Sequence, residues 1–270
     1  MVQVHNFSYG LLNPVLAYLI SCLGCFLGLQ CTARARAMAG AARARWLLLA
    51  AVSIGATGIW VMHFIAMLGY TINGQAISYN VPVTILSMVI AIAVVAVGLF
   101  IVGFGPSGDR NRLLIGGSII GIGVAGMHYM GIWAMRMPDT MGFSPVLFIL
   151  SVIIAMVAGT AALWCAARLR GTWATFVASL IMGVAVSGMH YTGMAALSVR
   201  PVVGGGMAAM GTGASATAFL LPLILGISIV AFLVTAIVTM APTEEEMRED
   251  AALMERIAEL SRNLGESQRR

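Results

Sequence analysis

Charged residues are scarce in this 270-residue chain, and they are unevenly placed. Only 9% of the residues are charged, whereas 60% are hydrophobic, a balance that a water-soluble domain of this size could not hide from water. No aspartate or glutamate precedes Asp109, and most of the acidic residues fall between Glu244 and Glu259. The composition therefore excludes an ordinary soluble enzyme and predicts a protein that lies mostly in lipid.

Lysine is absent, so all fifteen basic residues are arginines. A retinal-binding rhodopsin is excluded, because its Schiff base requires a lysine. The net charge is +5, but the arginines flank apolar runs instead of forming a patch for nucleic acid, and no nucleic-acid partner is expected. The four cysteines lie in or beside apolar runs, which argues against an extracellular disulfide framework.

Long apolar runs account for most of the chain. Seven windows reach the roughly 20 residues that a helix needs to cross a bilayer. The sequence therefore predicts an all-α, polytopic membrane protein with seven transmembrane helices. The windows are 11–32, 47–69, 81–104, 113–136, 145–168, 173–197 and 217–240.

Arginines follow the first, third and fifth windows, whereas the loops after the second, fourth and sixth windows carry few basic residues. Cytoplasmic loops are enriched in arginine, so we expect the N-terminus outside, the C-terminus in the cytoplasm, and the chain in a bacterial inner membrane. The arginines that carry this argument are Arg34, Arg36, Arg43, Arg45, Arg110, Arg112, Arg168 and Arg170.

The last thirty residues differ from the rest, which predicts a division into a membrane domain (1–240) and a cytoplasmic helix (241–270). An acidic stretch is followed by Leu253, Ile257, Leu260 and Leu264, spaced alternately by four and three residues. This spacing is typical of a short coiled coil, which would join two copies of the chain as a homodimer. A solvated amphipathic tail explains the pattern as well.

One short motif recurs in the second, fourth and sixth windows. It reads Met62-His63-Phe64, then Met127-His128-Tyr129, then Met189-His190-Tyr191. Alternate helices run in the same direction through a membrane, and each histidine lies roughly 10 Å from the outer end of its window, at 1.5 Å per residue. The sequence therefore predicts a ring of three imidazoles near the outer face.

A lone histidine in an apolar helix is usually a core residue bonded to a backbone carbonyl. Three at one depth favour a shared polar function, because ionisable side chains are costly in a bilayer. We therefore predict that His63, His128 and His190 bind a metal ion. His5, ahead of the first window, could add a fourth imidazole from above.

Methionines accompany the histidines. Met67 and Met194 follow His63 and His190 by four residues and thus share their helix faces; they are predicted ligands. In the other copy the equivalent residue is Ile132, so Met127 and Met130 are the sulfur candidates there, and Met62 and Met189 are expected close to the site. Imidazole and thioether without carboxylate favours copper, especially Cu(I), with zinc or haem as alternatives.

Tyr129 and Tyr191 directly follow their histidines. Their hydroxyls could orient the neighbouring imidazoles, or the rings could belong to an aromatic belt at the membrane interface. Four glycines flank the motifs, and small residues let transmembrane helices approach closely. We expect a packing role for these glycines, which are Gly126, Gly131, Gly188 and Gly193.

With its three motif copies in alternate spans, the chain resembles the MHYT domain family, and Met189-His190-Tyr191-Thr192 spells the family's motif. The resemblance covers nearly all of residues 1–240. It implies a bacterial membrane sensor module that binds copper through these histidines and methionines, senses oxygen, carbon monoxide or nitric oxide, and often precedes GGDEF and EAL domains. A membrane metal-dependent oxidase, a copper-handling protein and a haem protein are the alternatives.

Overall fold

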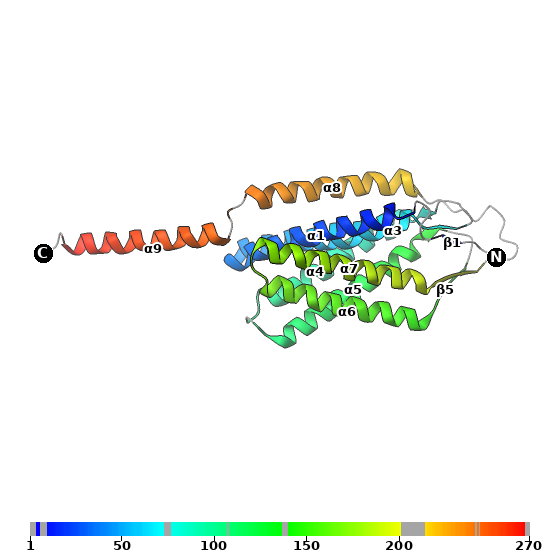
Figure 1. Ribbon diagram of the computed structural model, residues 1–270, viewed down its shortest axis with the longest axis horizontal. Helices are drawn as coiled ribbons and strands as arrows, with labels where there is room; N and C mark the ends of the chain where they lie inside the picture. Colours follow the sequence, from blue (N-terminus) through cyan, green and yellow to red (C-terminus); the bar gives the residue numbers. More distant parts are fainter. Residues whose placement is uncertain are drawn as a thin grey trace.

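Seven long apolar helices form the body of the protein, as predicted (Figure 1). The computed structural model describes residues 4–5, 10–72, 77–106, 108–136, 140–200, 214–240, 242 and 244–267. The all-α, multi-pass prediction is confirmed. The spans are α1 (Leu12–Ala37), the segment Gly40–Leu68, α4 (Val81–Gly103), α5 (Arg110–Trp133), α6 (Pro145–Arg168), α7 (Thr172–Ala196) and α8 (Ala216–Met240).

The sequence suggested one uniform α-helix for the second span, but the structure differs. It consists of α2 (Gly40–Val52), a π-helix η1 (Ser53–Val61) and α3 (Met62–Leu68), and every residue of η1 is buried. The π-helical ladder bonds residues five apart, so its turns are wider than those of an α-helix. A methyl group on Gly24 would lie 2.3 Å from the backbone nitrogen of Gly58. The backbone of η1 therefore packs directly against α1.

The bundle has a simple arrangement. Helices α4 to α7 contact one another in chain order, and α1 packs against both η1 and α7. Helix α8 runs along one side of the bundle, and α9 (Glu244–Ser267) continues beyond it (Figure 1). Leu253 and Ile257 of α9 are 56% and 49% exposed.

Short antiparallel strands lie together at one end of the bundle, here called the strand end (Figure 1). They were not predicted from the sequence. They pair β1 with β2, β3 with both β4 and β7, and β5 with β6, and so connect loops far apart in the chain. The strands are β1 (Val4–His5), β2 (Thr71–Ile72), β3 (Ser78–Tyr79), β4 (Met135–Arg136), β5 (Thr140–Phe143), β6 (Leu197–Arg200) and β7 (Ala214–Ser215).

At the opposite end, here called the arginine end, three arginines of α1 and α2 donate to carbonyls in or next to the last turns of other helices. These carbonyls have no partner within their own helix and carry its negative dipole, so guanidinium groups stabilise them. Three helices are thereby tied to the start of the chain. Arg34 donates to Val238 O of α8, Arg36 to Ala166 O and Leu169 O at the end of α6, and Arg43 to Gly103 O of α4.

We predict that Arg34→Ala loosens α8. The buried Arg34 also lies over the Trp46 ring, 5.6 Å from its centroid, and a hydrogen bond from a charged donor contributes about 1.5–3 kcal/mol. Thermal unfolding should start at a lower temperature, with faster hydrogen exchange in the last turn of α8. The exposed Arg45→Ala is the matched control; equal losses in both variants would contradict the prediction.

Candidate metal centre

The three motif histidines meet at one point inside the bundle. His63 of α3, His128 of α5 and His190 of α7 are all buried, and each lies five or six residues before its helix ends near the strand end. Nδ1 of His63 lies 3.0 Å from Nδ1 of His190 and 3.1 Å from Nδ1 of His128. The predicted ring of imidazoles is therefore present, and it could hold a metal ion.

The three rings are arranged with nearly threefold regularity. Their centroids are 4.9–5.1 Å apart in all three pairs, and each ring plane stands at 80–89° to the other two. Three helices from different parts of the chain thus present the same side chain in the same way. This follows from a repeated motif on parallel helices at one depth.

Hydrogen bonds among the three imidazoles cannot satisfy all of them. An imidazole nitrogen has a single in-plane position, which holds either a proton or a lone pair. One Nδ1–H can bond one neighbouring Nδ1, and the third nitrogen is then left over. Nδ1 of His63 is close to both other Nδ1 atoms, so it can satisfy only one of them. A cation that accepts three lone pairs would resolve the conflict.

Two glycines make room for two of the rings. A methyl group on Gly131 would lie 2.4 Å from Nε2 of His63, and one on Gly193 would lie 2.2 Å from Nε2 of His128. Each glycine comes three residues after a motif histidine, and its helix supports the imidazole of another copy. In the first copy this position is Ala66, which is also buried. These glycines therefore position the histidines.

Gly126 and Gly188 differ from Gly131 and Gly193. A methyl group on either would meet no atom within 4 Å, so the expected role in close helix packing is wrong for these two. The general rule that small residues permit close approach does not tell which of four flanking glycines faces a neighbour.

The imidazoles lack the hydrogen-bonded support usual for metal ligands. Metal-bound histidines normally donate their second nitrogen to a carboxylate, carbonyl or water. Nε2 of His63 and of His128 are buried without a hydrogen-bond partner in the part of the chain that the structure describes. Their orientation is therefore set by packing against Gly131 and Gly193.

The methionines on the histidine helices are part of the core. Both predicted sulfur ligands are buried, Met67 at 1% and Met194 at 5% exposure, and they belong to the main hydrophobic cluster. Ligation by their sulfur atoms stays a prediction. Met62, Met127 and Met189 are likewise buried, and Met130 is partly buried.

The two tyrosines contact the site with their rings. The ring of Tyr129 lies edge-on to His128 and that of Tyr191 edge-on to His190, both with centroids 4.9 Å apart. The hydroxyl of Tyr129 shares a hydrogen bond of 2.6 Å with the hydroxyl of Ser151 on α6. This hydroxyl thus anchors α5 to α6.

Aromatic side chains close the site towards the strand end. Phe64 stacks edge-on against His63 and also contacts Tyr79 of β3, at centroid distances of 4.7 and 5.6 Å. Tyr79 is buried, and burial raises the pKa of its hydroxyl above the ordinary value and that of Tyr70 to about 12. Both phenols therefore stay neutral. Neither tyrosine was predicted from the sequence as part of the site, although each lies next to the end of an apolar run.

The backbone of His5 lies at the strand end of the bundle. It pairs with Thr71 in the two-stranded β1–β2 sheet. Its side chain lies outside the described part of the structure, so the fourth imidazole stays a prediction.

Comparisons with known proteins point to bacterial signalling. The family model MHYT, described as a bacterial signalling protein N-terminal repeat, matches residues 57–116 and 121–179. The first match includes His63 and the second includes His128. No solved structure matches the chain.

Three curated relatives are signalling proteins. The chain is 34% identical to the Pseudomonas aeruginosa bifunctional diguanylate cyclase/cyclic di-GMP phosphodiesterase MucR, over 70% of this chain and 28% of the relative. It is 35% identical to the cyclic di-GMP phosphodiesterase NbdA of the same species, over 72% and 25%. It is 30% identical to the Bacillus subtilis signaling protein YkoW, also over 72% and 25%. The chain thus spans about a quarter of the length of these relatives.

We predict that Gly131→Ala displaces the His63 imidazole. The added methyl group has no space beside Nε2, and overpacking of this kind costs about 1–3 kcal/mol. The unfolding temperature should fall, and the imidazole nitrogen signals of His63 should shift in NMR spectra. Gly126→Ala on the same helix is the matched control, since it adds the same methyl group and gains the same helix propensity without a neighbour. Identical behaviour of the two variants would refute the supporting role.

Proposed function

Because the chain belongs to the MHYT family of bacterial signalling proteins and is a multi-pass inner-membrane protein, we propose that it is a sensor module whose three histidines bind a metal ion, most suitably copper. The observation that carries the proposal is the convergence of three buried Nδ1 atoms that cannot satisfy one another by hydrogen bonding. A shared cation gives each lone pair a partner.

The donor set suits copper. No aspartate or glutamate lies within any of the seven membrane-spanning helices as the structure describes them. Ions that prefer oxygen ligands are therefore disfavoured. Ligand nitrogens about 2.0–2.1 Å from one ion lie roughly 3.3–3.6 Å apart in a tetrahedral or trigonal site, and the separations of 3.0 and 3.1 Å come within about half an ångström of this. Met67 and Met194 would add sulfur ligands that favour Cu(I) over zinc.

The alternatives fit the geometry less well. Two axial ligands of a haem lie on opposite faces of the porphyrin, which has to pass between them; nitrogens 3.0 Å apart leave no room for it. An oxidase that reduces oxygen has to deliver protons, and acidic side chains in the membrane commonly relay them. The spans of this chain offer none.

A signal would start at the histidines and end at the arginine end. His63, His128 and His190 would hold the copper ion, which would supply either a binding position for a diatomic gas such as oxygen, carbon monoxide or nitric oxide, taken in exchange for a methionine sulfur, or a change of oxidation state. The histidines stand on α3, α5 and α7, so a changed fit among them alters the packing of these helices. Helix α9 would carry this change onward, and two relatives are named as enzymes of cyclic di-GMP turnover.

Metal analysis tests the site. We expect one copper ion per chain in the purified protein and its loss in His63→Ala, His128→Ala and His190→Ala. Met67→Leu and Met194→Leu, which preserve volume, should weaken Cu(I) binding by about tenfold or more and leave zinc binding less affected. His5→Ala should weaken binding if its imidazole is a ligand.

Met254→Leu, on the exposed surface of α9, is the control for the methionine variants. Unchanged metal content in all three histidine variants would reject the metal centre. A Soret band in the absorption spectrum would show that the site binds haem and would reject copper.

Helix α9 is expected to join two copies of the chain. Leu253 and Ile257 are exposed on α9 and form part of the predicted seam. Ile257→Glu should therefore weaken dimerisation in nanodiscs by about tenfold or more, because it buries a charge in an apolar interface. Ala258→Glu adds the same charge on another face of the helix and should leave dimerisation unchanged. A chain that is monomeric before any substitution would contradict the prediction.

A further inference from the structure

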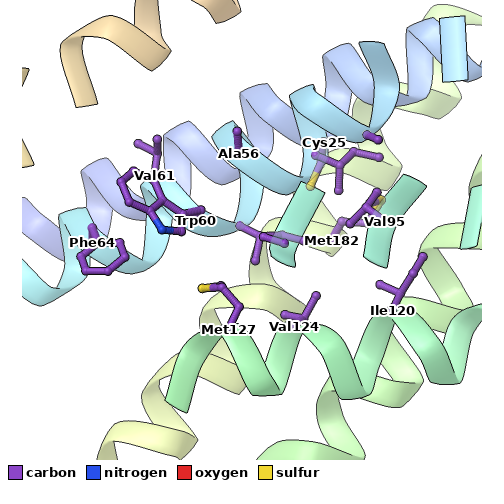
Figure 2. Close-up of a cluster of buried hydrophobic side chains, with 14 of the residues drawn as sticks. Cys25, Ala56, Trp60, Val61, Phe64, Val95, Ile120, Val124, Met127 and Met182 are labelled. Carbon is purple, nitrogen blue, oxygen red and sulfur yellow. The ribbon is translucent and has the colours of Figure 1, made fainter. Parts of the chain in front are cut away.

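A cavity of about 460 Å³ lies inside the bundle, between the histidines and the arginine end. Apolar side chains from α1, η1, α4, α5, α6 and α7 form its wall. No charged or hydroxyl side chain lines it within the described part of the chain, and its polarisable groups are the thiols of Cys25 and Cys165 and the thioethers of Met182 and Met189. Figure 2 shows several of these side chains around a common space.

The cavity lies on the axis of the three histidines. Its wall includes Ile59, Val124 and Val186, and each of them precedes one motif histidine by four residues. On the α-helices α5 and α7, this spacing puts Val124 and Val186 on the face of their histidine and about 6 Å from it along the axis. Ile59 lies in the π-helix η1, and its place beside them follows from the cavity wall that it shares with them. The three aliphatic side chains thus form a layer one turn beneath the imidazoles. We call this layer the apolar ring.

A second layer continues the same column. Ile120 and Met182 line the cavity and precede His128 and His190 by eight residues. In Figure 2, Ile120 and Val124 project from the same side of their helix. The cavity therefore leads along the helix faces that carry the histidines.

The cavity opens to the outside between α6 and α7. Three of its wall residues, Trp164, Val177 and Ile181, are 48%, 40% and 65% exposed. Small residues, among them Ala158 and Ala162, leave the space between these two helices open. The surface at this place belongs to two membrane-spanning helices, so the opening faces lipid.

Aromatic side chains of the described residues pack beside His63 on the side of the strand end. Phe64 and Tyr79 are buried above His63 and stack edge-on, and the paired strands connect the loops above them. A ligand that comes from the lipid therefore meets the histidines from the side of the apolar ring.

Building on the proposed function, we propose that this cavity takes up a small, uncharged, apolar molecule of the class of oxygen, carbon monoxide and nitric oxide from the bilayer and delivers it through the apolar ring to the histidines. Apolar gases dissolve in hydrocarbon, and apolar protein cavities stay dry and bind xenon or similar small solutes. The wall offers a hydrated ion or polar metabolite only the thiols of Cys25 and Cys165 and the indole of Trp164, too little to replace its hydration.

Xenon is a direct probe of the cavity and requires no metal. The structure of the full chain under xenon pressure should show xenon between the apolar ring and Ala162, in the wild type and equally in His63→Ala. Ala162→Phe fills the entrance and should lose this xenon. Val157→Phe, on the lipid-facing side of the same helix and 65% exposed, adds a similar side chain and should keep it.

Gas kinetics then test the path to the histidines. In the metal-loaded protein, carbon monoxide should rebind after photolysis about tenfold or more slowly in Ala162→Phe, and at the wild-type rate in Val157→Phe. Ala158→Phe, one helical turn earlier, provides a second blocking variant if Ala162→Phe does not fold.

The outcomes separate this inference from the metal proposal. A wild-type cavity without xenon, or one filled by continuous density of a lipid chain, overturns the gas path even if copper is bound. Equal carbon monoxide rates in blocked and control variants overturn it as well. Xenon in the cavity of a protein that binds no metal would support the gas-binding cavity and refute the metal centre.

Discussion

The structure depends on one constraint, which is the meeting of three imidazole nitrogens inside a hydrocarbon environment. Two Nδ1 pairs lie 3.0 and 3.1 Å apart. At these distances three protonated imidazoles would repel one another, and one proton on Nδ1 can bond only one of the two neighbouring nitrogens. The fold can hold them only by bringing three helices to one depth and removing side chains at Gly131 and Gly193. Much of the bundle's regularity follows from this requirement, because a small shift of one helix would break the match.

The features that repeat could be predicted from the sequence. Hydropathy alone defines seven spans, and the three Met-His motifs fix the depth of the imidazoles, since both depend on local composition and on the constant rise of a helix. The features that depend on neighbours could not. The π-helix η1 packs its backbone against α1 and has no counterpart in the hydropathy of the second span. The glycines beside the rings are recognisable only once the facing helix is known. The arginine-based orientation stays a prediction.

The site and the rest of the molecule are connected through packing more than through polar bonds. Nε2 of His63 and His128 rest against helix backbone, and the hydroxyl of Tyr129 bonds Ser151 of α6 instead of an imidazole. Changes at the histidines therefore reach neighbouring helices as changes in fit. The cavity beneath the apolar ring gives these side chains space to move, which a fully packed core would not.

The arginines at the end opposite the strands have two duties at once. By the positive-inside rule, Arg34, Arg36 and Arg43 predict that the loop after the first span stays in the cytoplasm, and in the folded protein they hold the ends of α8, α6 and α4. The predicted orientation and the final assembly thus depend on the same three side chains. Moving these charges to another loop would disturb both the insertion of the spans and the packing of three helix ends.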